Sequence, residues 1–97
     1  MSRKQIERRL TDVGDRLRVL RDEAAADRSQ LDQVTEEADD ARLRALVSDS
    51  PLARHDHRDA RASADTLAKR YERVVAKIAE LEARQDELLE ELTALHG

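Results

Sequence analysis

The stretch Ser48-Asp49-Ser50-Pro51 holds the only proline of a 97-residue chain. Proline disfavours helical geometry in the residue before it and lacks the amide that a helix interior requires. It suits the first position of a helix, where Ser50 can accept a hydrogen bond from the amides that follow. The stretch therefore predicts that one helix ends near residue 47 and another begins at Pro51. A single kinked helix is the alternative.

The composition of the rest of the chain is typical of long helices. Charged residues make up 41% and aromatic residues 1%, with two glycines and no cysteine. A layered α/β or β fold needs more aromatic and β-branched residues and more turns. These classes are excluded, and so is a disulfide framework.

Apolar residues on both sides of the proline recur at alternating steps of four and three. A heptad pattern sustained over several repeats predicts coiled-coil helices. We call the residues of this pattern the seam residues. They are Ile6, Leu10, Val13, Leu17, Leu20, Ala24, Asp27, Leu31, Val34, Ala38, Ala41 and Ala45, then Ala53, His57, Ala60, Ala64, Leu67, Tyr71, Val74, Ile78, Leu81, Gln85, Leu88, Leu92 and Leu95.

Folding the chain about residue 49 pairs the twelve seam residues before the turn with twelve of those after it, as in Leu17 with Leu81. Basic residues dominate 1–21 and acidic residues dominate 80–97, so an antiparallel pairing brings opposite charges together. Expected flanking pairs are Arg9 with Glu91, Glu23 with Lys77, and Arg44 with Asp56.

The sequence thus predicts an all-α protein, a long two-helix antiparallel coiled-coil hairpin. One domain covers residues 1–97, with a helix over about 3–47, a turn at 48–50 and a helix over about 51–95. Seam residues near the turn are mostly alanines, which bury little apolar area, so the half of the hairpin near the turn is expected to be the less stable one.

Two further sets of residues follow from the heptad positions. Ala68, Val75 and Leu89 share a position beside the seam and form a candidate self-association face, which predicts a homodimer built as a four-helix bundle. Scattered surface apolar residues are the alternative. Asp27, Tyr71 and Gln85 are candidate register-setting polar residues of the core, with the Tyr71 hydroxyl expected to donate to Asp27.

The cluster Arg54-His55-Asp56-His57-Arg58-Asp59 is the richest in chemistry. His55 and Asp59 lie on one helical face, but zinc needs three or four ligands and no others are found, so no metal or cofactor is expected. The segment 14–20, GDRLRVL, is similar to the first helix of helical chorismate mutases, yet the lysine, arginine and glutamate of that family cannot be placed. The sequence predicts a protein that is not an enzyme.

Composition also bears on location and on partners. The first 21 residues are basic, but an acidic helix is expected beside them, so nucleic acid is not an expected partner. The absence of a long apolar run or a signal sequence predicts a cytoplasmic protein without membrane contact. The ratio of 15 arginines to 3 lysines is associated with GC-rich bacterial genomes.

The run EEADDARLRALVSDSPLA at 36–53 resembles segments of small uncharacterised actinobacterial helical proteins, which implies a helical hairpin and no known activity. A hairpin with Asp49 at its turn also resembles the coiled-coil domain of Gre-type transcription factors. That resemblance implies a transcription regulator that docks its tip on RNA polymerase. The chain departs from the family by carrying a single aspartate at the turn where paired acids are needed, among five nearby arginines.

The function expected from these observations is that of a coiled-coil protein-interaction or adaptor module with unidentified protein partners. A polymerase-docking regulator is the alternative, and a helical enzyme of chorismate-mutase type is the third reading. The candidate partner-binding residues lie at the tip and are Asp49, Pro51, Arg54, His55 and Arg58.

Overall fold

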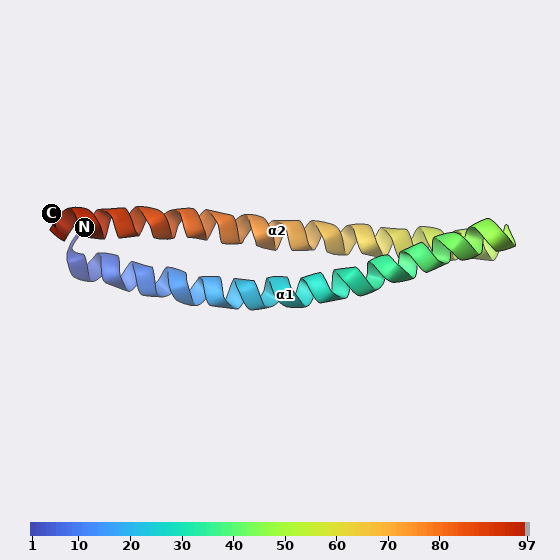
Figure 1. Cartoon of the computed structure of the whole chain (residues 1–97), viewed down its shortest axis with the longest axis horizontal. Coiled ribbons are helices and arrows are strands. Elements are labelled where there is room, and N and C mark those ends of the chain that lie inside the picture. The colour runs from blue at the N-terminus through green and yellow to red at the C-terminus, as the bar shows by residue number, and fades with distance from the viewer. Residues whose placement is uncertain (97) are drawn as a thin grey trace. The chain divides into compact units, whose positions relative to one another are not determined.

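The computed structural model describes residues 1–96, all of which except a few at the ends and the turn lie in two helices. Helix α1 spans Arg3–Ser48 and helix α2 spans Pro51–His96 (Figure 1). The break between them lies at Asp49 and Ser50, so the kinked single helix is wrong. Gly97, the last residue of the predicted domain, lies outside the described residues.

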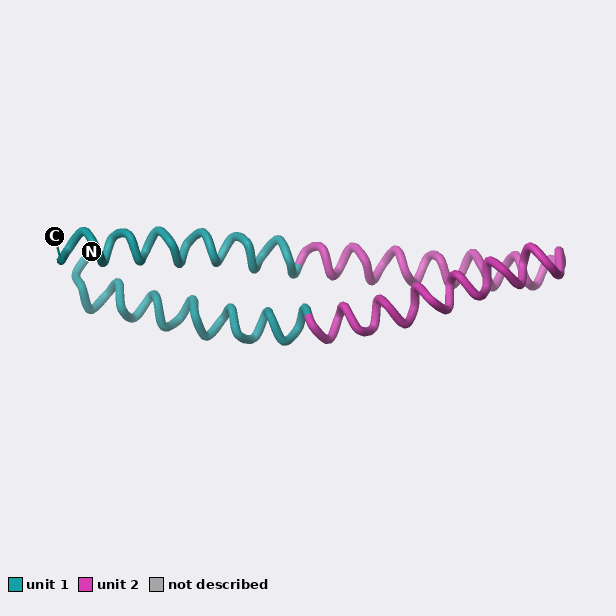
Figure 2. Tube along the Cα trace, viewed as in Figure 1, with its two compact units in different colours: residues 1–24, 74–97 teal, residues 25–73 magenta. Residues whose placement is uncertain are grey.

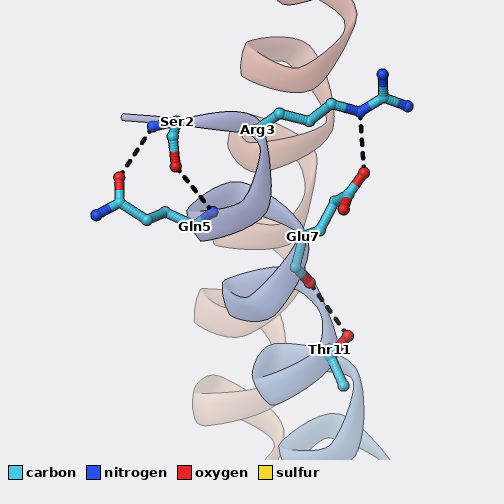
Figure 3. Close-up of polar contacts among 5 residues, drawn as sticks. All are labelled: Ser2, Arg3, Gln5, Glu7 and Thr11. Carbon is cyan, nitrogen blue, oxygen red and sulfur yellow. Dashed lines mark hydrogen bonds and ion pairs between the residues drawn. The ribbon is translucent and has the colours of Figure 1, made fainter.

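The start of α1 is capped by a reciprocal pair of hydrogen bonds. The Gln5 amide donates to Ser2 Oγ at 3.3 Å, and the Ser2 amide donates to Gln5 Oε1 at 2.9 Å (Figure 3). This capping box satisfies amides that have no partner within the helix. One turn on, Arg3 pairs with Glu7 at 3.0 Å.

The start of α2 is capped as the sequence predicts. The Ala53 amide donates to Ser50 Oγ at 3.1 Å, with Pro51 at the first helical position. Ahead of it, Asp49 adopts a φ of 48°, in the left-handed region that commonly ends a helix, and its amide donates to the Ala45 carbonyl at 3.1 Å. The chain reverses over two residues because the Asp49 amide closes the end of α1 and the Ser50 hydroxyl caps the start of α2.

The chain packs as two compact units, each containing a segment of both helices (Figure 2). Unit 1 comprises Met1–Ala24 and Val74–Gly97, and unit 2 comprises Ala25–Arg73. In a pair of antiparallel helices each residue meets only residues at its own level, so contacts divide into clusters along the pair. The all-α helical hairpin is confirmed, and in each unit the segments of α1 and α2 pack against each other.

Burial follows the seam closely. Every seam residue is buried or half-buried except Leu95, which is 54% exposed near the end of α2. In unit 1 the buried side chains are large, among them Ile6, Leu17 and Leu88. In unit 2 the buried apolar residues are Ala38, Ala41 and Ala64.

None of the three expected flanking ion pairs forms. Within unit 1 the pair across the helices joins Arg21 to Glu82 at 3.4 Å, and within unit 2 it joins Arg70 to Asp27 at 3.5 Å. The pairs Arg9 with Glu91, Glu23 with Lys77, and Arg44 with Asp56 are not made within 4 Å. Exposed side chains gain little free energy from any one ion pair, and Lys77 and Glu91 lie instead within 4 Å of Glu80 and Arg84 on their own helix. Neither helix, as far as it is described, is long and apolar enough to cross a membrane.

Candidate functional site

Large apolar side chains are exposed in one place above all, around the turn of unit 2. Val47 is 89% exposed and Leu52 69%, and Leu46 and Leu43 are 68% and 54% exposed. We call these four residues the turn cluster. They fall within ten consecutive residues, and no exposed large apolar side chain occurs elsewhere in unit 2. Single exposed leucines are normal on a protein surface, but four together are not.

Part of the turn cluster lines an open groove of about 460 Å³ between the last turns of α1 and the first turns of α2. Leu43, Val47 and Leu52 form its apolar wall, and Arg44 and Asp56 are its charged residues. Ser48, Ser50 and Ala53 complete the lining. Other open grooves of the described residues have similar volumes, about 320–500 Å³, so the apolar wall, and not the volume, distinguishes this groove.

The predicted tip residues lie around this groove but do not line it. Arg54 and Asp49 engage each other, since Arg54 Nη1 donates to Asp49 Oδ1 at 2.8 Å and to the Asp49 carbonyl at 3.0 Å. His55 Nε2 lies 3.1 Å from Asp59 Oδ2 on the same helix. Pro51 opens α2, and Arg58 is exposed.

Sequence reasoning missed the turn cluster, although a signal for it was present. Leu43, Leu46, Val47 and Leu52 are all apolar and all lie off the seam. An apolar residue off the seam has no partner within the hairpin, so a run of four at the turn predicts an exposed patch.

The polar residues of the core are arranged differently from the expectation. Asp27 is 5% exposed, and its Oδ2 has no hydrogen-bond partner, so the Tyr71 hydroxyl does not donate to this atom. The nearest cation is Arg70, with Nε 3.5 Å from Oδ2. The half-buried Tyr71 ring instead lies under the Arg28 guanidinium, 5.7 Å from the ring centroid, and Gln85 is half-buried in unit 1. Arg70 and Arg28 therefore contact the two residues that were expected to pair with each other.

The three candidate self-association residues, Ala68, Val75 and Leu89, differ from one another in exposure and in neighbours. In unit 1, Val75 is 41% and Leu89 47% exposed, and midway between them in sequence Glu82 pairs with Arg21. In unit 2, Ala68 is half-buried and lines a groove with Leu31 and Ala64. The apolar face is thus interrupted by a charged pair in unit 1.

The histidines add no metal site. His55 is engaged with Asp59, and His57 is half-buried at its seam position. Within residues 1–96 there is no group of three or more His, Cys, Asp or Glu residues that could hold a metal ion.

The groove beside the turn is therefore the feature of this chain that most resembles a binding site. Comparison with known proteins finds no matching family model, no matching curated protein and no matching solved structure.

Proposed function

We propose that the protein is a non-enzymatic interaction module that binds a protein partner at the turn between its helices. The observation that carries the proposal is the exposed turn cluster, Leu43, Leu46, Val47 and Leu52. Burying apolar surface drives most protein association, at about 25 cal/mol per Å² removed from water. These four side chains are the largest gathered source of such surface in unit 2.

The local structure supports a rigid docking surface. Ser50 caps the start of α2, and Arg54 donates hydrogen bonds to the carbonyl and the carboxylate of Asp49. These bonds fix the turn that joins the two walls of the groove. A surface that is ordered before binding loses less conformational entropy when the partner docks. The proposal keeps the cytoplasmic setting and the self-association expected from the sequence.

A polymerase-directed role has less support. It would use Asp49 as a free acid at the turn, whereas the Asp49 carboxylate accepts a hydrogen bond from Arg54. The groove, not the acid, is the feature on which the proposal depends.

Site-specific photo-crosslinking tests the proposal. A photoreactive residue replaces Val47 in one variant and Val19 in a matched control, because Val19 is also an exposed valine but lies in unit 1. In native lysate we expect a discrete protein adduct from position 47 only, which disappears when Leu43→Ser/Leu52→Ser is added. Identical adducts from both positions, or none from 47, would contradict the proposal.

A further inference from the structure

The charge around the groove points to the kind of partner that fits it. Residues that directly precede a seam residue lie on one side of the helix pair, and residues that directly follow one lie on the other. Arg44 and Asp56 precede Ala45 and His57, and both line the groove. The groove therefore opens on the side of the residues that precede the seam residues, which we call the groove side.

Most of the arginines near the turn lie on the opposite side, among the residues that follow a seam residue, and two of them already form ion pairs. Arg42, Arg54 and Arg61 each follow a seam residue. Arg54 is bound to Asp49, and Arg61 pairs with Asp65 at 3.5 Å. A second groove of unit 2 is lined by Arg61 together with Arg28, Thr35 and Ala68, each of which also follows a seam residue, which is consistent with two distinct sides.

The side that carries the groove is acidic along α1. Residues seven apart on a helix share a face, with a drift of about 20° per heptad. Seven positions before Leu43, Arg44 and Val47 stand Glu36, Glu37 and Asp40. All three acids are exposed and make no ion pair within 4 Å.

Two acids of α2 also lie on this side. Asp59 stands seven positions after Leu52 and contacts His55 Nε2 at 3.1 Å, and Asp56 lies at the groove wall without an ion pair.

Asp40 stands three positions before Leu43, a rise of about 4.5 Å, and Glu36 stands seven positions before it, a rise of about 10.5 Å. These distances are comparable to the screening length of about 8 Å at physiological salt, so a ligand in the groove experiences the field of the acids. Within one heptad of the groove Arg44 is the one arginine or lysine on this side, and Arg70 and Arg73, which also precede seam residues, lie farther along α2.

We propose that the groove binds a basic amphipathic helix of another protein, with apolar side chains against Leu43, Val47 and Leu52 and Lys or Arg side chains toward the acids of the same side. This inference rests on the proposed function and names the chemistry of the partner. A helix laid in an apolar groove uses anchors at positions i, i+3 or i+4, and i+7. The flanking charges then choose among helices and fix the orientation. A second copy of the chain fits less well, since it would bring the same acids together.

Selection from a random-peptide library tests the inference on the full chain. Peptides of about 16 residues form helices of about 24 Å, long enough to cross both the groove and the nearest acids. We expect the enriched peptides to carry apolar residues at helical spacing and a positive net charge. Val47→Ser/Leu52→Ser should weaken their binding about tenfold or more. Both side chains are largely exposed, so these changes leave the fold intact, as circular dichroism will verify.

Two matched variants, each of which removes three carboxylates, test whether the acids contribute to peptide binding. Glu36→Gln/Glu37→Gln/Asp40→Asn alters the groove side, and Asp32→Asn/Asp39→Asn/Asp65→Asn alters the opposite side, where those three residues line the second groove. We expect the first variant to weaken peptide binding and to flatten its salt dependence, and the second to leave both unchanged.

The outcomes separate the two proposals. Binding that depends on Val47 and Leu52 but selects acidic or uncharged peptides overturns the basic partner and leaves the interaction function standing. Wild-type self-association that Val47→Ser/Leu52→Ser abolishes identifies a second copy as the occupant and also overturns the basic partner. If no enriched peptide depends on Val47 and Leu52, the inference is overturned, and the crosslinking result then decides the function separately.

Discussion

Arg54 binds the residue that directly follows α1, because its Nη1 donates to the carbonyl oxygen of Asp49 at 3.0 Å and to Oδ1 of the same residue at 2.8 Å. The bond fixes a residue whose φ of 48° is uncommon outside glycine. The turn is thereby specified by its side chains as well as by the proline that follows it.

This arrangement predicts a difference between two substitutions at residue 49. Asp49→Gly loses the carboxylate but accepts the positive φ freely, whereas Asp49→Ala loses the carboxylate and keeps the strain. We expect Asp49→Ala to lower the free energy of unfolding by about 1 kcal/mol more than Asp49→Gly does. Urea denaturation measures both.

The control for the turn is Asp56→Ala, which removes an exposed carboxylate of α2 that makes no ion pair. It should change the free energy of unfolding by less than about 0.5 kcal/mol. Equal effects of alanine and glycine at residue 49 would show that the backbone strain is absent.

The buried carboxylate of Asp27 predicts a gain of stability on its removal. Oδ2 has no hydrogen-bond partner, and the Arg70 side chain that approaches it is 55% exposed. Replacing a poorly compensated buried charge by an apolar residue at a seam position should raise the free energy of unfolding, by roughly 1–3 kcal/mol for Asp27→Leu.

A double-mutant cycle with Arg70→Ala completes this test. Arg70→Ala should cost less than about 1 kcal/mol in the wild type and nothing measurable beside Asp27→Leu. A loss of stability in Asp27→Leu would mean that Asp27 has a partner that stabilises the fold, and would contradict the prediction.

The two units should differ in local stability, since their buried residues differ in size. Leu17, Leu20 and Leu88 are buried in unit 1, and Ala38, Ala41 and Ala64 in unit 2. We expect the amides of the three alanines to exchange hydrogen faster than those of the three leucines, because less apolar area is lost when their segment opens. Hydrogen exchange followed by NMR measures each amide, and equal protection in both units would refute this.

The self-association proposal predicts a change of mass. Val75 and Leu89 are half exposed in unit 1, and two charges there should separate a dimer into monomers. Light scattering should report a dimer for the wild type and a monomer for Val75→Glu/Leu89→Glu.

Two exposed alanines of α2 offer a matched control for the dimer. Ala76→Glu/Ala83→Glu adds the same charge at positions that are two residues from the nearest seam residues, and should leave the mass unchanged. A monomeric wild type would remove the proposal.

The seam could be predicted because its signal is local and repeated. Each helix turn places the next apolar residue on the same face, so the spacing alone identified every fully buried residue. Leu95 is the one exposed seam residue, and Gly14, Glu23, Ala68 and Arg84 are half-buried off the seam. The N-cap at Ser50 was equally predictable, since proline and serine act through the backbone of their own neighbours.

Pairings between side chains could not be predicted in this way. Asp27 faces Arg70 instead of accepting from Tyr71, and the expected partners Arg44 and Asp56 flank an apolar groove without touching each other within 4 Å. Heptad spacing sets the layer in which a residue lies, but long side chains span several layers and choose among near-equal neighbours. That choice depends on distances of a few ångströms across two helices, which the packed structure sets and the spacing of residues along one chain does not.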